Sequence, residues 1–189
     1  MCLLTVAWNA HPNYPLVFAG NRDEFHDRPT AVADWWVDAP AVLGGRDLRA
    51  GGSWLGISRS GRLAVITNQP RLELSDGRRA SRGALVKDFL TSAAPVDAYA
   101  SALAREAAEY AGFGLLVGDL DQMRYVGHEG RPGNVVCRVL EPGYCGLSNA
   151  SYGTDWPKIA YLKAGLAELL EQNRVSEAAL LGLLENRGP

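Results

Sequence analysis

The chain has 189 residues, of which 47% are hydrophobic, and this length and composition fit a single domain with a substantial core. Its 19 basic and 21 acidic residues give a net charge of −2, and this near balance argues against nucleic-acid binding, which normally requires a basic excess. No run of about 18 apolar residues occurs, so we expect no integral membrane segment. Because the N-terminus also lacks the features of a signal peptide, the sequence predicts a cytoplasmic protein.

The N-terminal third of the chain predicts a β-rich region. Two apolar segments, 3–9 and 16–21, flank a turn that contains two prolines, and we expect them to pair as a hairpin. Two more strands are predicted over 53–58 and 62–67. The residues between the two pairs carry no strand prediction, although Gly44-Gly45 and Gly51-Gly52 enclose a charged segment.

The rest of the chain predicts alternating helices and strands. Helices are expected over 81–90, 96–110, 155–171 and 177–184, and strands over 113–118, 123–127 and 135–140. Strands followed by helices, then strands and helices again, predict sheets that are covered by helices.

The cysteines and histidines predict neither disulfides nor a metal site. Cys2, Cys137 and Cys145 are too few for a disulfide framework, and no Cys-x-x-Cys spacing occurs. The three histidines are scattered along the chain. We therefore expect no metal or cofactor, and we expect Cys137 and Cys145 to pack as small buried residues.

Cys2 is the unusual feature of the sequence, because removal of Met1 would place a thiol and a free α-amine on one residue. An α-amine has a pKa of about 7.7–8.0, so it can act as a base near neutral pH and activate its own nucleophile. The alternative is that Cys2 is only a small apolar residue at the start of a core strand.

The register of the expected hairpin decides which residue lies opposite Cys2. If Asn9 pairs with Leu16, Cys2 lies opposite Asp23, and if Trp8 pairs with Leu16, it lies opposite Arg22. A guanidinium beside a thiol stabilises the thiolate, and a carboxylate can hold the ammonium of a terminal amine. The alternative is an ordinary surface ion-pair cluster at a strand end.

Two asparagines and one glycine-flanked segment could support such a site. Asn68 and Asn149 both lie at expected strand ends, where their amides could donate to an oxyanion, although asparagine is also an ordinary turn residue. The segment 44–54 either bends over a pocket or forms a structural loop. It matches neither a Walker loop nor a dinucleotide-binding fingerprint.

A series of short motifs resembles the NRDE family, also called the transport and Golgi organisation 2 family. The resemblance covers most of the chain and is densest before residue 90. It is carried in order by Met1-Cys2, Asn21-Arg22-Asp23-Glu24-Phe25, Arg28-Pro29, Leu43-Gly44-Gly45-Arg46-Asp47, Gly51-Gly52-Ser53-Trp54-Leu55-Gly56, Thr67-Asn68, Ser81-Arg82-Gly83, Leu147-Ser148-Asn149 and Trp156-Pro157-Lys158.

The resemblance implies an α+β fold like that of the N-terminal nucleophile hydrolases, a four-layer αββα sandwich with two antiparallel sheets. By analogy with the penicillin V acylase and bile-salt hydrolase group, Cys2 would attack a linear amide and form a thioester. Arg22 and Asp23 would orient the nucleophile and the amine, with an uncertainty of one residue in this assignment. Asn68 and Asn149 would be the oxyanion donors.

The family resemblance also implies a second function, non-enzymatic binding or transfer of haem or lipid. The expected partner is accordingly a small-molecule amide or an amphipathic ligand, haem among them. Family members usually run longer and close with Tyr-Gly-Thr-Arg, so we expect residues 1–189 to be one NRDE domain that a further C-terminal segment follows. Tyr152-Gly153-Thr154-Asp155 is similar but lies earlier and lacks the arginine.

Overall fold

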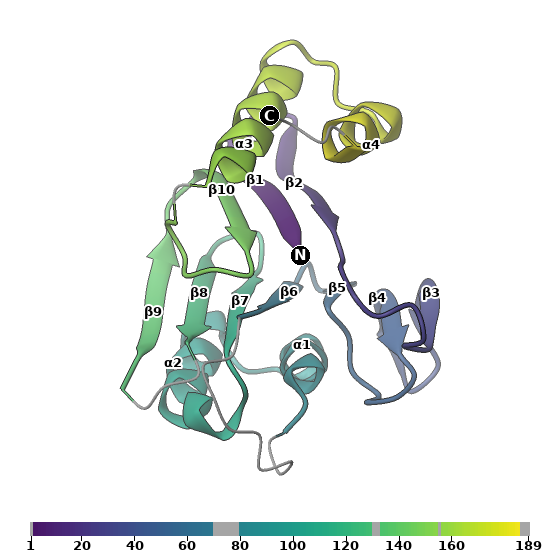
Figure 1. The fold of residues 1–189 in the computed structure, drawn as a ribbon, viewed down its shortest axis with the longest axis vertical. Helices are drawn as coiled ribbons and strands as arrows, with labels where there is room; N and C mark the ends of the chain where they lie inside the picture. The colour runs from purple at the N-terminus through teal and green to yellow at the C-terminus, as the bar shows by residue number, and fades with distance from the viewer. Residues whose placement is uncertain (1, 70–79, 130–132, 155, 186–189) are drawn as a thin grey trace. The chain divides into compact units, whose positions relative to one another are not determined.

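The computed structural model describes residues 2–69, 80–129, 133–154 and 156–185. Within them it contains two antiparallel sheets and four α-helices, which confirms the predicted α+β class (Figure 1). The chain divides into two compact units, one formed by residues 1–23 and 141–189 and the other by residues 24–140. A single domain over the whole chain stays a prediction.

The first unit is a three-stranded sheet with two helices. β1 (Leu3–His11) is the central strand, and it pairs antiparallel with β2 (Tyr14–Asn21) and with β10 (Gly143–Ser148). α3 (Pro157–Glu171) packs on β1 and β10, and α4 (Glu177–Glu185) packs on β2 and on α3. The cluster beneath the helices consists of Ala7, Val17, Leu162, Leu166, Leu170 and Leu183.

The two faces of β1 carry different side chains because neighbours along a strand point to opposite faces. Leu3 and Ala7 belong to the cluster beneath α3 and α4. Leu4, Val6 and Trp8 therefore point to the other face, and all three are buried as well. Burial of both faces explains why the sequence of β1 is apolar at odd and even positions.

The second unit is a seven-stranded antiparallel sheet in which the strands lie side by side in chain order. Antiparallel neighbours need only short connections, and the chain therefore forms a meander. The helices of this unit lie together in the connection between its fourth and fifth strands. The strands are β3 (Thr30–Trp36), β4 (Ala39–Asp47), β5 (Leu55–Ser58), β6 (Leu63–Asn68), β7 (Phe113–Gly118), β8 (Met123–His128) and β9 (Val135–Leu140).

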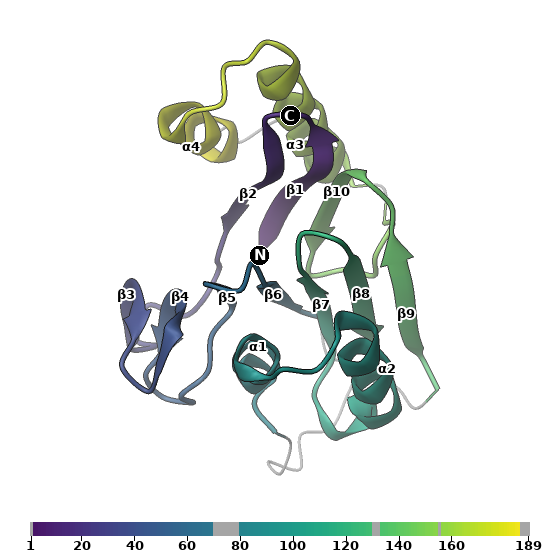
Figure 2. The same cartoon turned by 180° about the vertical axis from the view of Figure 1, so that it is seen from behind.

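Two helices cover one face of this sheet. α1 (Arg82–Thr91) packs on β4, β5 and β6, while α2 (Val96–Glu106) packs on β7, β8 and β9 and continues into the short 3-10 helix Ala107–Glu109 (Figure 2). The largest buried cluster lies between helices and sheet, and it includes Ala64, Ile66, Val86, Phe89, Leu115, Val117 and Val126.

The structure corrects the sequence predictions at three strands. β3 and β4 carried no strand prediction, β10 was expected only as a strand end at Asn149 without bounds, and α2 ends at Glu106 rather than at residue 110. β3 changes register twice against β4, so its side chains do not keep the simple alternation that predicts a strand. The first residue of the helix expected over 155–171, Asp155, lies outside the described residues.

Gly146 lets α3 approach the sheet of the first unit closely. It pairs with Thr5 of β1, and a Cβ at this position would lie 2.5 Å from Cγ2 of Ile159 on α3. Real side chains do not pack this tightly, so any larger residue here must push α3 away from β10 and β1.

We therefore expect Gly146→Ala to destabilise the protein by about 1–3 kcal/mol, the usual range for overpacking. Denaturant unfolding measures the free-energy difference. Ile159→Ala removes the atom that clashes, so the double variant should lose less stability than the sum of the two single variants. Additive effects would contradict close packing at this position.

Candidate functional site

The register of β1 is fixed on both sides at its first residue. Leu3 pairs with Asn21 of β2 and with Ser148 of β10, and Trp8 pairs with Leu16. Of the two registers that the sequence left open, the one that pairs Trp8 with Leu16 is therefore confirmed, and the one that pairs Asn9 with Leu16 is wrong.

Continued by one residue, the same register puts Cys2 between Arg22 and Asn149. Cys2 directly precedes β1, Arg22 directly follows β2, and Asn149 directly follows β10. All three are half-buried. In a ladder continued to these three residues, directly opposed side chains would project to the face that carries Leu4, opposite the helices.

Asp23 also contacts Cys2, although through its backbone. The Cys2 Sγ lies 3.8 Å from the carbonyl oxygen of Asp23, a distance at which a thiol can donate a hydrogen bond to oxygen. The contact holds the thiol at the point where the chain leaves the first unit. Four of the five predicted site residues, Cys2, Arg22, Asp23 and Asn149, therefore lie at one end of one sheet.

Asn21 is a residue of this region to which sequence reasoning gave no role. Its Nδ2 donates to the carbonyl oxygen of Leu184 at 3.2 Å, near the C-terminal end of α4. The last carbonyls of a helix lack partners within the helix, so this bond satisfies one of them. The register of the β1–β2 hairpin could have predicted the face of Asn21, because the residue opposite Leu3 must face the same side as Leu3.

Asn68, the fifth predicted residue, belongs to the second unit. It is the last residue of β6 and pairs with Phe113 of β7. Ile66, two residues earlier, belongs to the cluster beneath the helices, and alternation gives Asn68 the same face. Its neighbour Thr67 points to the other face and donates to the carbonyl oxygen of Gly114 at 3.3 Å.

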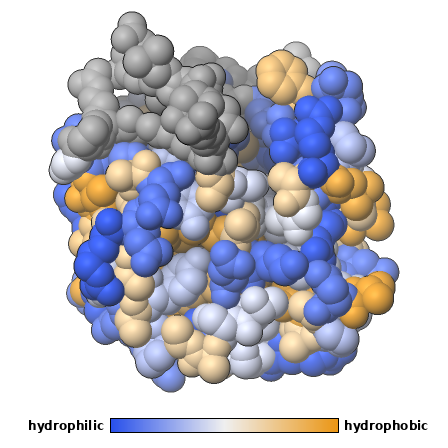
Figure 3. All heavy atoms as spheres, turned by 90° about the horizontal axis from the view of Figure 1, so that it is seen from below, coloured by the Kyte–Doolittle hydropathy of each residue, from blue (hydrophilic) through white to orange (hydrophobic). Residues whose placement is uncertain are grey.

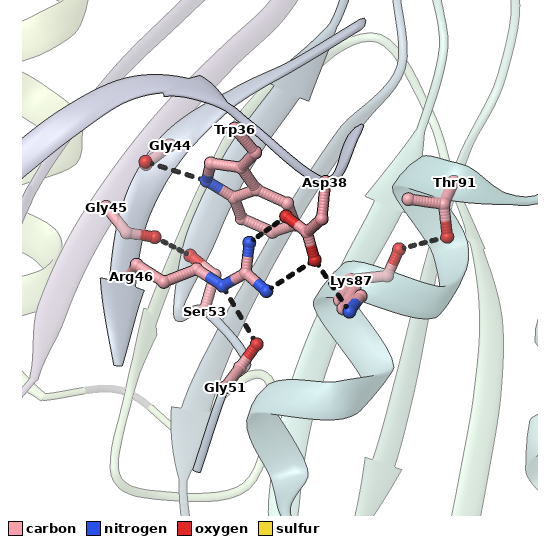
Figure 4. A network of polar contacts seen from close by, with 9 residues as sticks. All are labelled: Trp36, Asp38, Gly44, Gly45, Arg46, Gly51, Ser53, Lys87 and Thr91. Atoms are coloured by element: carbon pink, nitrogen blue, oxygen red, sulfur yellow. Dashed lines mark hydrogen bonds and ion pairs between the residues drawn. The ribbon is translucent and has the colours of Figure 1, made fainter. Parts of the chain in front are cut away.

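The segment 44–54 belongs in part to the second sheet, because residues 44–47 end β4 and residues 48–54 connect β4 to β5. That it bends over a pocket stays a prediction. Arg46 binds Asp38 with two hydrogen bonds, of 2.6 and 2.9 Å, and its Nε donates to the carbonyl oxygen of Gly51 at 2.9 Å (Figure 4). Lys87 of α1 lies 3.2 Å from the same Asp38 carboxylate. The Arg46 guanidinium holds the pKa of Asp38 well below its usual value, with a smaller effect from Lys87. These charges fasten the β3–β4 hairpin to α1.

The two other cysteines lie in contrasting places. Cys137 is exposed on β9, which corrects the expectation that it packs as a buried residue. Cys145 lies on β10, where burial raises the pKa of its thiol to about 11 against a weaker opposing effect of Lys163. In the described part of the chain, no three His, Cys, Asp or Glu side chains are grouped so that they could hold a metal ion.

A family model described as "Transport and Golgi organisation 2" matches residues 1–187. The chain belongs to this family. The mouse "Transport and Golgi organization 2 homolog" is 38% identical to this chain. The match covers 98% of this chain and 72% of the mouse protein. The human homologue is 37% identical with the same coverage, and the Drosophila protein is 37% identical over 49% of this chain and 36% of its own length.

Two solved structures share the fold of this family member. A Caenorhabditis elegans orthologue of N-acylethanolamine-hydrolyzing acid amidase superposes with a TM-score of 0.65 at 12% identity, over 98% of this chain and 86% of that one. A C2A mutant of conjugated bile acid hydrolase from Clostridium perfringens superposes with a TM-score of 0.50 at 14% identity, over 87% and 57%. Both likenesses confirm the N-terminal nucleophile hydrolase-like fold that the motifs implied.

None of the helices in the described ranges combines the length and the apolar character needed to cross a membrane.

The different surroundings of Cys137 and Cys145 predict that their thiols react at different rates. Only the thiolate attacks an aromatic disulfide reagent, and the raised pKa of Cys145 leaves little thiolate at pH 7.5. We expect Cys145 to react at least about tenfold more slowly than Cys137 in the native protein. Mass-spectrometric peptide mapping over time measures both rates, and denatured protein, in which the two rates should converge, is the control. Equal rates in the native protein would contradict the burial of Cys145.

Proposed function

We propose that this protein is an amidohydrolase in which Cys2 is the nucleophile and its own α-amine is the base. The observation that carries the proposal is the register of β1, which brings Arg22 and Asn149 to either side of Cys2 at the end of the central strand. The shared fold with an acid amidase and with a bile acid hydrolase gives additional support.

The reaction requires that Met1 be removed, and Met1 lies outside the described residues. The exposed α-amine of Cys2 takes the proton of its thiol, and the thiolate attacks the carbonyl carbon of the amide. The oxyanion that forms collapses, the C–N bond breaks, and the amine leaves with the proton that the α-ammonium returns. The product of this half-reaction is a thioester on Cys2.

Water completes the cycle by attacking the thioester carbonyl. The α-amine takes a proton from this water, the C–S bond breaks, and the acid is released. The proton on the α-ammonium then returns to the Cys2 thiolate. No oxidant, metal or cofactor is required for either half of this reaction.

Three neighbours would assist this chemistry. The positive charge of Arg22 would favour the thiolate, and the segment around Asp23, whose carbonyl oxygen lies 3.8 Å from Sγ, would orient the thiol. Asn149 follows β10 directly beside Cys2 and is the better supported oxyanion donor. Asn68 stays the second predicted donor.

The same comparison supports a proposal for the substrate class. The two relatives are named for an N-acylethanolamine and a conjugated bile acid, and each of these joins an apolar acyl group to a small polar amine. We propose a linear amide of an amphipathic acid for this protein, and these two compounds are the first probes.

Hydrolysis of both probes should depend on Cys2. Cys2→Ala removes the nucleophile, and we expect kcat to fall by about 10⁴-fold or more. Asn149→Ala removes one oxyanion donor and should lower kcat by about 10²–10³-fold. Chromatographic detection of the released acid measures the rates, and mass spectrometry of an acid-quenched reaction should show the acyl group on Cys2.

Cys137→Ala is the matched control, because it removes an exposed thiol from the other unit and should leave the rate unchanged. Hydrolysis that persists in Cys2→Ala, with no acyl group on Cys2 of the wild-type protein, would overturn the proposed function.

A further inference from the structure

The segment that joins β2 to β3 contains a motif residue that the proposed chemistry does not use, Arg28. The segment comprises residues 22–29. Its first part lies at the proposed nucleophile, because the carbonyl oxygen of Asp23 is 3.8 Å from the Sγ of Cys2. The contacts that fix the rest of the segment therefore decide how firmly Asp23 is held at the thiol.

Asp47, the last residue of β4, binds the Arg28 side chain with two-point geometry. The Arg28 Nη2 donates to one carboxylate oxygen of Asp47 at 2.6 Å, and its Nε donates toward both oxygens, at 3.2 and 3.3 Å. The two side chains are only 26% and 15% exposed. Partly buried pairs with this geometry are stronger than exposed ion pairs, most of which contribute little to stability.

A turn connects Arg28 to the residues beside the thiol. The backbone N–H of Arg28 donates to the carbonyl oxygen of Phe25 at 2.9 Å, and this bond closes the turn over residues 25–28. Only Glu24 lies between this turn and Asp23. Because each residue spans at most about 3.6 Å, the peptide chain transmits a restraint on the turn directly to Asp23.

Asp47 is itself held in place, so Arg28 is bound to a fixed point. The Asp47 carboxylate accepts hydrogen bonds from the amides of Arg49 and Ala50, at 3.0 and 3.2 Å, and its backbone N–H donates to the carbonyl oxygen of Gly52 at 2.9 Å. Burial alone would raise the pKa of Asp47, but the hydrogen bonds from Arg28 and from the two amides lower it. The pair therefore stays ionised at neutral and alkaline pH.

We propose that the Arg28–Asp47 ion pair is a positioning pair, which holds the carbonyl group of Asp23 at the thiol of Cys2. This inference rests on the proposed function of Cys2. Without the ion pair, the residues between Asp23 and β3 gain conformational freedom, and a freer segment occupies the contact at the thiol for less of the time. The thiol then loses an acceptor that orients it for attack.

A second ion pair of the same unit provides a matched control. Arg46 binds Asp38 with two hydrogen bonds, of 2.6 and 2.9 Å, and fastens the β3–β4 hairpin to α1 instead of the segment that leaves β2 (Figure 4). Ion pairs suit a hydrophilic surface, and on the face shown in Figure 3 the described hydrophobic side chains lie in small groups between hydrophilic ones. If loss of an ion pair acted only by loosening the unit in general, both pairs would have the same effect.

The rate at which iodoacetamide alkylates Cys2, measured against pH by peptide mapping, reports the contact without any substrate. An S–H group that donates to a carbonyl oxygen is stabilised in its neutral form, so loss of the acceptor favours the thiolate. We expect the midpoint of the profile to fall by about 0.3–0.5 pH unit in Arg28→Ala and Asp47→Asn. The shift should be smaller in Arg28→Lys, which keeps the charge but not the two-point geometry. Arg46→Ala should leave the midpoint unchanged.

Turnover of the two amide probes should change in the opposite sense. We expect Arg28→Ala to lower kcat by about tenfold and to change KM by less than about threefold, because more thiolate is present but it is less well oriented. Arg46→Ala should change neither constant. Melting curves show which variants are folded at the assay temperature, and Arg28→Lys and the isosteric Asp47→Asn replace Arg28→Ala if it is not.

The positioning role would be overturned by an unchanged midpoint in Asp47→Asn and the folded Arg28 variants, by an equal shift in Arg46→Ala, or by an unaltered kcat in an active enzyme. If the wild-type protein hydrolyses neither probe, the proposed function fails. A lower midpoint confined to the Arg28 and Asp47 variants would then still support the positioning of the thiol.

Discussion

β1 is paired along both of its edges, and this double pairing determines what surrounds Cys2. A slip of one residue on either side would turn every side chain of the slipped strand to the other face and remove Arg22 or Asn149 from the level of Cys2. The apolar side chains of β1, buried on both faces, make such a slip costly. Stability of the core and position of the thiol therefore depend on the same register.

Contacts between the two outer strands of the first unit and its helices support the register of β1. Gly146 admits Ile159 of α3 against β10, and Asn21 ties the end of β2 to α4 through Leu184. Both contacts lie within a few residues of the strand ends that carry Asn149 and Arg22. The helices thus hold the two outer strands against β1 from the face opposite the thiol.

The sequence predicted the β1–β2 hairpin because it contains two long apolar runs and a proline-rich turn, and it restricted the neighbour of Cys2 to two residues. It predicted a strand end at Asn149 but neither the bounds nor the partner of β10, whose Gly143 and Gly146 lower strand propensity and whose partner β1 lies about 140 residues away. Asn149 could therefore be named as a candidate but not placed beside Cys2. The face of Asn68 was not predicted either, because β6 is apolar on both faces.

The three cysteines show how one residue type acquires different chemistry from its surroundings. Burial suppresses the thiolate of Cys145, Cys137 is exposed on β9, and Cys2 combines partial burial with an adjacent cation and an amide. Of these, only Cys2 can also supply its own base. That capacity depends on one covalent event outside the fold, the removal of Met1.

The intact mass of the native protein, measured before and after brief treatment with iodoacetamide at neutral pH, tests this account most directly. The account predicts a mass lower than that of the full chain by one methionine residue, with the first alkylation mapped to Cys2. Retention of Met1 in the native protein, or a Cys2 that stays unmodified while Cys137 is fully alkylated, would contradict it.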